Sequence, residues 1–257
     1  PLFLTANVAT NAPALVTNIV SVSGGNDAYL TNNISDDETV INPMIDNSVI
    51  VLVGFDVSGQ TNYGLSPLLP TTNAANLTCS GLTRGSGVTT GSGAAARAWG
   101  GVNWTNHTSA AAISANRFCT FTVIPENGYE LSCTALSRLD YRHSATGATN
   151  GLLQYQLGNE PFVDITNFLY TSSSSSGGSI GPIDLSQIDE LQNITTNLTF
   201  RIVNWNGTGF SGSWYIFDVA NNANPDLVLE GIVVAAAANP PAMPAELQVL
   251  PFTNNVF

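Results

Sequence analysis

The sequence predicts an all-β protein, a jelly-roll β-sandwich with a strand-like extension at each end. Three observations lead to this prediction. Short apolar stretches recur along the chain between clusters of Gly, Asn, Ser and Pro, a pattern typical of strands joined by turns. No stretch keeps an apolar period of about 3.6 residues, so long helices are not expected. Hydrophobic residues make up 44% of the 257 residues, enough to fill a large core.

The clearest strand is expected at Val49–Phe55, where an unbroken apolar run indicates burial on both faces. Residues 118–124 alternate between apolar and Thr side chains, which is the period of two of a half-buried strand. Further strands are expected at residues 129–139, 151–157, 198–205, 213–219 and 227–234. The segment Ile183–Leu191 is expected to form one helical turn at most.

Both ends of the chain differ from its middle. The first 48 residues contain five acids, no arginine, and apolar segments at Pro1–Leu4 and Ala14–Val22. The last 21 residues are rich in Pro at first and then offer a strand-like piece at Leu247–Phe252. The predicted organisation is an N-terminal extension at residues 1–48, a sandwich at residues 49–236 and a C-terminal extension at residues 237–257.

The charge content excludes several classes of partner. The chain has no lysine, and its six arginines face 18 acids, which gives a net charge of −12. Charged residues make up 9% of the chain, against about 25% in an ordinary domain. The surface must therefore consist largely of neutral hydrogen-bonding groups, 28 Asn among them. Phosphate backbones and anionic membrane surfaces would be repelled, so neither nucleic-acid binding nor membrane insertion is expected.

An extracellular or cell-surface location is expected. The chain starts at Pro1 without an initiator Met or a basic leader, and we interpret this start as a mature N-terminus after processing. Seven Asn-x-Ser/Thr triplets are candidate N-glycan sites, although a chain rich in Asn and Thr also produces such triplets by chance. They lie at Asn33, Asn76, Asn103, Asn106, Asn193, Asn197 and Asn206.

Two of the three cysteines are candidates for a disulfide. A turn signal at Pro125–Gly128 separates Cys119 from Cys133, and a hairpin about that turn would place the two residues opposite each other on one face. A cross-strand disulfide would suit an oxidising compartment. The alternative is that both are small buried hydrophobic residues. Cys79 is unpaired in either case.

Catalytic residue types are scarce, and no enzyme activity is expected. The chain has only two histidines, His107 and His143. Asp140 and His143 would point to opposite faces of a strand, so we expect His143 on the surface at a strand end. No Gly-x-Ser-x-Gly motif lies between a strand and a helix. No pair of acids is marked as buried beside an aromatic residue, as glycoside hydrolysis would need.

Two binding roles remain open. Asp56 and Asp218 end strands that a jelly roll can bring together, and their carboxylates would suit a structural calcium ion, the one cofactor considered. The alternative is that both belong to solvated acidic loops. Trp205 lies beside a turn, where an exposed ring could stack on a sugar. A core position for Trp205 is the alternative.

The stretch from about Val49 to Val234 resembles a secreted bacterial β-sandwich module that recurs in adhesin-like surface proteins, often beside sorting signals. The segments that carry the resemblance include residues 51–56, 76–85, 103–105, 121–129, 136–142, 144–149, 191–195, 200–202 and 213–219. The resemblance implies a jelly roll and supplies no catalytic residues. Phe217 stands where that module usually has an acid, and Cys119 and Cys133 stand at its large apolar positions, which implies that both cysteines face inward.

These features predict a non-catalytic extracellular structural subunit of a filament, sheath or surface layer. Its partners would be copies of itself, bound by strand addition through the two extensions. Sheet proteins use lysine to protect exposed edges, and neither extension has any basic residue. The alternative is a carbohydrate-binding or adhesive surface module whose partners are glycans.

Overall fold

The structure is a computed structural model that describes residues 15–21, 31, 33–40, 48–91, 95–172 and 176–236. The chain divides into two compact units, Pro1–Ser48 and Val49–Phe257. The predicted C-terminal extension at residues 237–257 lies outside the described residues, as does the apolar segment Pro1–Leu4.

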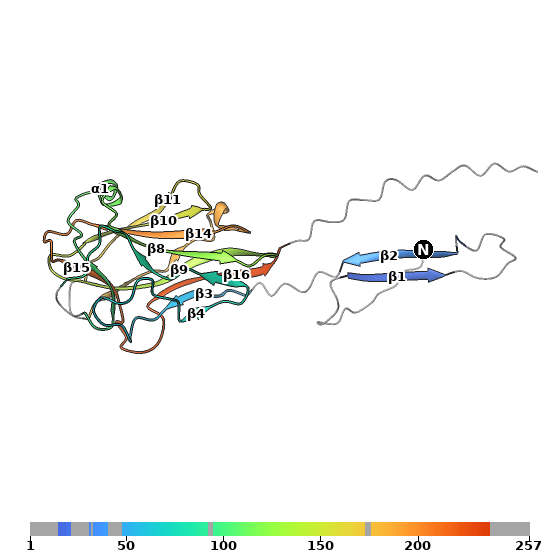
Figure 1. The fold of residues 1–257 in the computed structure, drawn as a ribbon, viewed down its shortest axis with the longest axis horizontal. Coiled ribbons are helices and arrows are strands. Elements are labelled where there is room, and N and C mark those ends of the chain that lie inside the picture. The colour runs from blue at the N-terminus through green and yellow to red at the C-terminus, as the bar shows by residue number, and fades with distance from the viewer. Residues whose placement is uncertain are drawn as a thin grey trace, which may run out of the picture. The chain divides into compact units, whose positions relative to one another are not determined.

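The larger unit is built from two antiparallel sheets (Figure 1). The six-stranded sheet has the order β11-β10-β14-β8-β5, and β6 also pairs with β8. Its strands are β5 (Leu77–Cys79), β6 (Thr83–Arg84), β8 (Phe118–Pro125), β10 (Asn150–Leu157), β11 (Val163–Leu169) and β14 (Leu198–Trp205). The all-β prediction is thus confirmed at the level of a two-sheet sandwich.

The eight-stranded sheet has the order β4-β3-β16-β9-β15-β7, and β12 and β13 also pair with β9. Its longer strands are β3 (Ile50–Phe55), β7 (Ala98–Val102), β9 (Tyr129–His143), β15 (Ser213–Phe217) and β16 (Leu227–Ala235). Its short strands are β4 (Thr72–Asn73), β12 (Gly178–Ile180) and β13 (Ile183–Asp184).

In the described residues of the sandwich, helical structure is limited to two short elements. The helix α1 (Ser109–Ser114) begins after Thr108, whose hydroxyl accepts a hydrogen bond from the Ala111 N–H at 3.2 Å. A single 3₁₀ turn, η2 (Asp189–Leu191), lies within the segment where one helical turn was expected. In the part of the chain that the structure describes, no helix is long and apolar enough to cross a membrane.

The core forms where the inner faces of the two sheets meet. In β8, Cys119, Phe121 and Val123 are buried, as the alternating sequence predicts. Phe121 contacts Phe55 of the opposite sheet edge to face, with ring centroids 5.5 Å apart. It also stacks on Phe200 of the neighbouring strand β14 at 5.4 Å. These rings join the two layers by apolar burial.

The turn after Pro125 does not form the predicted hairpin. It leads from β8 in the six-stranded sheet to β9 in the eight-stranded sheet. Cys119 therefore lies opposite Ile202 of β14, and Cys133 lies opposite Gly231 of β16. Both thiols are free and buried. The predicted cross-strand position for a disulfide is wrong, because β8 and β9 lie in different sheets. The alternative, that both cysteines are small buried hydrophobic residues, holds.

Asparagine occupies most of the left-handed backbone positions in the described residues. Seven of the nine non-glycine residues with positive φ are asparagines: Asn62, Asn76, Asn103, Asn116, Asn193, Asn206 and Asn221. The short polar side chain of Asn tolerates this conformation, because it can form hydrogen bonds with the nearby backbone. Four of the predicted glycan sites belong to this set, so those asparagines have a structural reason to be present.

The smaller unit contains an antiparallel hairpin of β1 (Leu15–Ser21) and β2 (Ile34–Val40). The hairpin forms a two-stranded sheet of its own. Ile19 and Ile34 lie on the same face, since Ile19 is opposite Asp36 and Ile34 is opposite Ser21. Their side chains are 70% and 65% exposed.

We expect Cys119 and Cys133 to react with an alkylating reagent only after the protein is unfolded, and without prior reduction. Burial raises the pKa of each thiol to about 12, so neither forms the reactive thiolate in the folded state. Intact-mass measurement after labelling, with and without denaturant, checks this. A pair that becomes reactive in denaturant only after reduction would contradict the free-thiol assignment.

Candidate functional site

Two polar sites lie on the eight-stranded sheet, and β9 contributes a residue to each. Side chains alternate along the strand, so Asp140 and Arg142 share the outer face while Tyr141 and His143 face the core. Asp140 belongs to a group of acids that we call the carboxylate cluster (Asp56, Asp140, Asp218 and Asp226). Arg142 lines a hollow that we call the arginine pocket.

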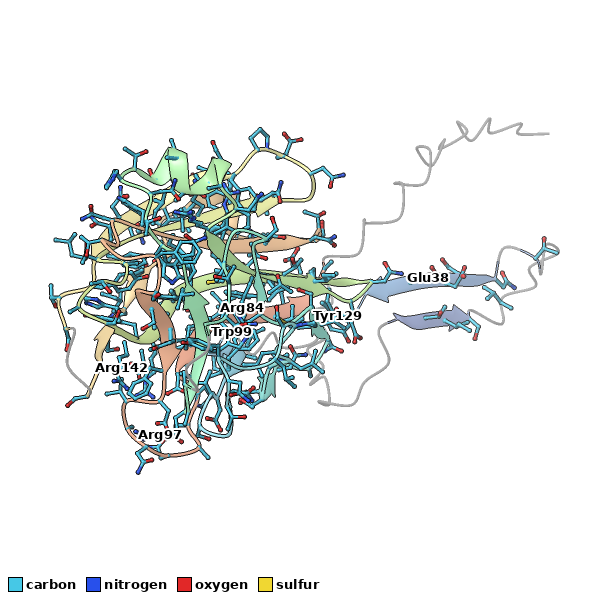
Figure 2. The ribbon with its side chains drawn as sticks, turned by 60° about the vertical axis from the view of Figure 1, so that its left-hand side comes forward. Glu38, Arg84, Arg97, Trp99, Tyr129 and Arg142 are labelled. Atoms are coloured by element: carbon cyan, nitrogen blue, oxygen red, sulfur yellow. The ribbon has the colours of Figure 1, made fainter. Side chains whose placement is uncertain are left out.

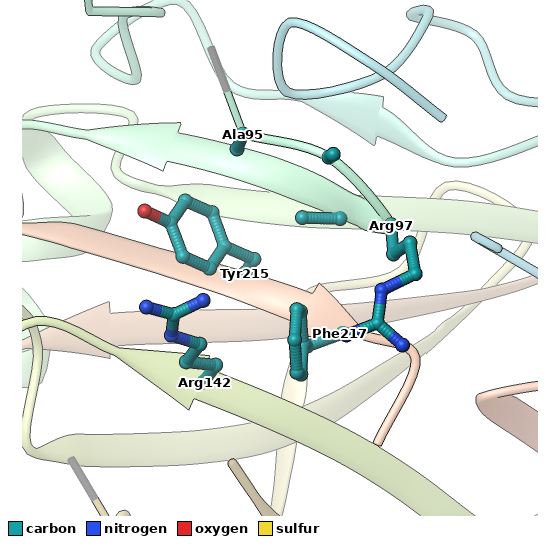
Figure 3. Close-up of a pocket in the computed structure, with 7 residues that line it drawn as sticks. Ala95, Arg97, Arg142, Tyr215 and Phe217 are labelled. Atoms are coloured by element: carbon teal, nitrogen blue, oxygen red, sulfur yellow. The ribbon is translucent and has the colours of Figure 1, made fainter. Parts of the chain in front are cut away.

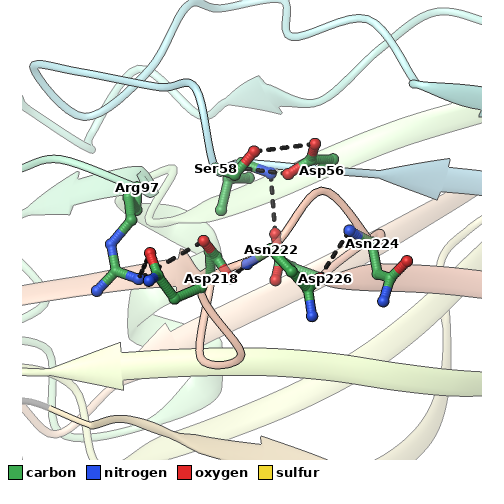
Figure 4. Close-up of polar contacts among 9 residues, drawn as sticks. Asp56, Ser58, Arg97, Asp218, Asn222, Asn224 and Asp226 are labelled. Carbon is green, nitrogen blue, oxygen red and sulfur yellow. Dashed lines mark hydrogen bonds and ion pairs between the residues drawn. The ribbon is translucent and has the colours of Figure 1, made fainter.

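The carboxylate cluster is held together around Asp226, which directly precedes β16 (Figure 4). The Asp226 carboxylate accepts a hydrogen bond from the Val57 N–H at 2.9 Å. Its backbone N–H donates to the Phe55 carbonyl at 2.7 Å, and its carbonyl accepts from the Asp140 N–H at 2.8 Å. Asp226 therefore connects the end of β3, the C-terminal part of β9 and the start of β16.

The other acids of the cluster have separate partners. Asp218 lies 3.7 Å from the Arg97 guanidinium and accepts a hydrogen bond from the Asn222 N–H at 3.1 Å. Asp140 lies 3.9 Å from the Arg138 Nε atom. The Asp56 carboxylate accepts from both the N–H and the hydroxyl of Ser58, at 2.7 and 3.0 Å. Neither Asp226 nor Asp56 forms an ion pair among the described residues, and Asp226, at 1% exposed, is the buried one of the two.

The environment of Asp226 favours its protonated form. Its pKa is raised to about 7, first by burial and then by the carboxylates of Asp218, Asp140 and Asp56. The hydrogen bond from Val57 acts in the opposite direction. Burial also raises the pKa of Asp140, and its hydrogen bond with Ser179 and the charge of Arg138 lower it.

The predicted calcium ligands Asp56 and Asp218 both belong to this cluster. Calcium binding gathers about six to eight oxygens whose lone pairs face the ion. Here Asp56 accepts hydrogen bonds from Ser58 through both oxygens, and Asp218 faces Arg97. Within the described ranges, no group of three or more His, Cys, Asp or Glu side chains is placed to hold a metal ion. In this structure the carboxylates of Asp56 and Asp218 are used in contacts within the chain, and the calcium site stays a prediction.

The arginine pocket has a volume of about 330 Å³ and lies on the outer face of the sheet (Figure 3). Its lining consists of Ala95, Ala96, Arg97, Ala98, Arg142, Tyr215 and Phe217. Figure 3 shows the Phe217 ring between the two guanidinium groups, and each lies 5.3 Å from the ring centroid. Arg142 is opposite Tyr215 in the sheet, and Tyr215 is opposite Gly100. Glycine and alanine on the β7 side leave the hollow unfilled.

Arg142 differs from the other five arginines in its partners. Its side chain forms no hydrogen bond or ion pair with any residue that the structure describes, whereas the side chain of each of the others forms at least one. Arg97, across the pocket, donates to Asn221 at 2.6 Å and pairs with Asp218. Arg84 donates to the Gly100 carbonyl and stacks on Trp99 at 4.5 Å (Figure 2).

A second hollow of about 340 Å³ adjoins the arginine pocket. It is lined by Tyr63, Thr89, Thr90, Gly91, Val102, Phe210 and Ser211. The Tyr63 ring lies 5.6 Å from the Tyr215 ring, so this aromatic contact joins the two hollows. Phe210 is 66% exposed. None of these residues was predicted from the sequence as part of a site. The available signal was Phe217 at an expected acidic position, because a ring there leaves Arg142 without a carboxylate partner.

Trp205 is buried, and the expectation that it is exposed for sugar stacking is wrong. Its side chain is 9% exposed and packs with Ala112, Leu152 and Val203. Ala112 belongs to α1, which lies against β14. The neighbouring turn is at the surface, but the helix covers the ring. Nothing local to Trp205 in the sequence indicates that cover.

His143 is also buried, contrary to its predicted surface position. It is 4% exposed, its Nδ1 atom lies 2.8 Å from the Ser144 carbonyl, and its ring stacks with Tyr141. It faces the core, while Asp140 faces the carboxylate cluster. The prediction that these two side chains point to opposite faces agrees with the separate contacts they make.

The predicted glycan sites differ in accessibility. Asn103 is 9% exposed, and its side-chain nitrogen donates to the Gly87 carbonyl at 3.1 Å. A glycan would be linked through that nitrogen, so Asn103 is the least accessible of the seven predicted sites, all of which stay predictions. Asn193, Asn197 and Asn206 are exposed, and Asn33, Asn76 and Asn106 are half-buried. The side-chain nitrogen of Asn206 donates to Thr149 at 2.9 Å.

Comparisons of the chain with models of protein families, with curated proteins and with solved structures found no match. The function therefore has to be argued from the geometry of this chain. The resemblance to secreted bacterial modules stays a prediction.

We expect Asp226→Asn to reduce the pH dependence of folding stability. A carboxyl group whose pKa rises from 3.8 to about 7 on folding stabilises the fold below about pH 4, and this contribution is lost as the pH rises through 7. The loss amounts to about 4 kcal/mol for a shift of this size. Asparagine keeps the acceptor for Val57 and removes the charge, so the variant should be the more stable protein at pH 8.

Urea denaturation of both proteins between pH 4 and pH 8 measures this difference. Asp189→Asn is the matched control, since Asp189 is an exposed acid of the same sandwich. If the wild-type protein and Asp226→Asn lost the same stability as the pH rises, the protonation of Asp226 would not be the cause of the pH dependence.

Proposed function

We propose that this protein is a non-catalytic structural subunit of an extracellular assembly such as a filament, sheath or surface layer. One observation carries the proposal: the hairpin β1–β2 forms a sheet apart from a sandwich whose two sheets already share a continuous core. A segment that adds no strand to its own domain is available to another copy of the chain.

The hairpin has a physical reason to seek a partner. A single two-stranded hairpin is marginally stable at best in water, because it has no second layer on which to bury its apolar side chains. Ile19 and Ile34 are largely exposed on one face of this hairpin. Covering one isoleucine contributes about 1.5–3 kcal/mol. Packing against a neighbouring subunit would supply that cover.

The sandwich offers an edge for such packing. Among the described strands, β11 is the longest edge strand, with 7 residues, and the edge strand β7 has 5. Val163 and Leu169 of β11 are 46% and 60% exposed. Natural edges are usually protected by lysine, proline or a bulge. This chain contains no lysine, and one bulge, at Ile165, interrupts the pairing of β11 with β10. We take β11 as the acceptor edge of the assembly.

A jelly-roll connectivity is part of the proposal. The orders β8-β14-β10-β11 in one sheet and β3-β16-β9-β12 in the other support it. The chain also passes from sheet to sheet between β8, β9 and β10, as wrapping of a long double ribbon requires. In such a fold, β11 ends one sheet and remains free for strand addition.

We expect Ile19→Asp to weaken self-assembly of the full-length protein. An aspartate at this position would place a charge in the contact and remove the apolar cover, which should raise the protein concentration needed for assembly roughly tenfold or more. Sizing chromatography and negative-stain microscopy of untreated protein measure the effect.

Leu65→Asp is the matched control, because Leu65 is 72% exposed on the sandwich and outside the hairpin. It should assemble as the wild-type protein does. A wild-type protein that stays monomeric at all concentrations would contradict the proposal. So would an Ile19→Asp variant that assembles normally.

A further inference from the structure

We propose that the arginine pocket binds a sugar that bears a carboxylate, such as a uronic acid, with Arg142 as the carboxylate ligand. This binding site goes beyond the proposed structural role and does not depend on it.

Arg142 is the residue that carries the inference. A guanidinium with unused donors is suited to a carboxylate, which it can bind through two parallel hydrogen bonds. The Arg142 side chain has no hydrogen bond or ion pair within the described part of the chain, yet it lines a pocket. Its contact with the Phe217 ring at 5.3 Å holds the group in place from one side and uses none of its N–H donors.

The two arginines of the pocket differ in whether an acid compensates their charge. Arg97 approaches Phe217 from the other side, and its charge is already compensated by Asp218 at 3.7 Å. Arg142 has no such compensation. The chain carries a net charge of −12, so its surface repels anions in general. A local uncompensated cation is therefore the point at which an anionic ligand can bind.

The size and lining of the pocket favour a sugar over a larger ligand. A volume of about 330 Å³ lies at the lower end of small-molecule sites. The Tyr215 hydroxyl donates to Ser213 at 2.6 Å, which leaves its oxygen free to accept from a ligand hydroxyl. Ala95, Ala96 and Ala98 supply a smooth apolar wall beside this polar edge.

The adjoining hollow provides room for a second sugar unit. The Tyr63 and Tyr215 rings lie between the two hollows, and Phe210 is exposed in the second one. Sugars combine hydroxyl groups with apolar C–H faces, and aromatic side chains with a polar tip match both features. A glycan chain with an acidic unit at Arg142 could extend across the tyrosines toward Phe210.

The test is a titration of the full-length protein with glucuronate, glucose and acetate, followed by calorimetry or NMR. Glucuronate should bind, and glucose should not, because it lacks the carboxylate. Acetate should bind more weakly, because it lacks the sugar ring. Arg142→Gln should weaken glucuronate binding roughly tenfold or more, since it removes charge-assisted hydrogen bonds.

Two further variants keep the result interpretable. Arg142→Lys retains the charge without the planar fork and should give an intermediate loss. Arg117→Gln is the matched control, since Arg117 donates to Thr105 and does not line the pocket. It should bind as the wild-type protein does. Thermal melts of all variants show whether each one is folded.

Three outcomes would overturn the proposal. The first is no glucuronate binding by folded wild-type protein, or binding that Arg142→Gln leaves unchanged. The second is acetate binding as tightly as glucuronate, which would remove the sugar from the assignment. The third is loss of self-assembly in Arg142→Gln without any glucuronate binding. That result would mean that the pocket receives a carboxylate from another copy, such as the exposed Asp36 or Glu38 of the hairpin.

Discussion

The pairing of β9 with its neighbours is the interaction on which the larger sheet depends. This strand of 15 residues pairs with β16 over most of its length and with β15 near its end, and it also holds β12 and β13. Because side chains alternate along β9, the four residues 140–143 contribute to three different parts of the molecule. Tyr141 and His143 complete the core, Asp140 joins the carboxylate cluster, and Arg142 lines the arginine pocket. A shift of one residue in register would exchange these roles.

The molecule satisfies its polar groups largely without charge. Asparagines occupy the left-handed turns, where lysine or glutamate would be strained. Five of the six arginines have a hydrogen-bonding or ionic partner in the described residues. Against that background, two charged groups stand out. The Asp226 carboxyl is buried without an ion pair, and the Arg142 side chain has neither a hydrogen bond nor an ion pair in the described residues. The first is expected to hold a proton, and the second is expected to hold a ligand.

The sequence predicts the individual strands of this protein better than it predicts which segments lie next to one another in the fold. The alternation in β8 and the apolar run in β3 identify strands, because each pattern is fixed by one strand's own burial. The disulfide prediction was wrong because a turn signal marks a reversal and does not say which sheet receives the next strand. Trp205 was misplaced because its cover comes from α1, about 90 residues earlier in the chain. The arginine pocket required the pairing of β7, β9 and β15, which no local pattern contains.

The central claim is that the sandwich is complete by itself while the hairpin β1–β2 needs a neighbouring subunit. Amide hydrogen exchange, measured on dilute and on assembled full-length protein, tests it most directly. The account predicts strong protection of β9 in both samples, and protection of residues 15–21 and 34–40 only in the assembled one. Hairpin amides protected as strongly as those of β9 in a dilute monomer would contradict the claim.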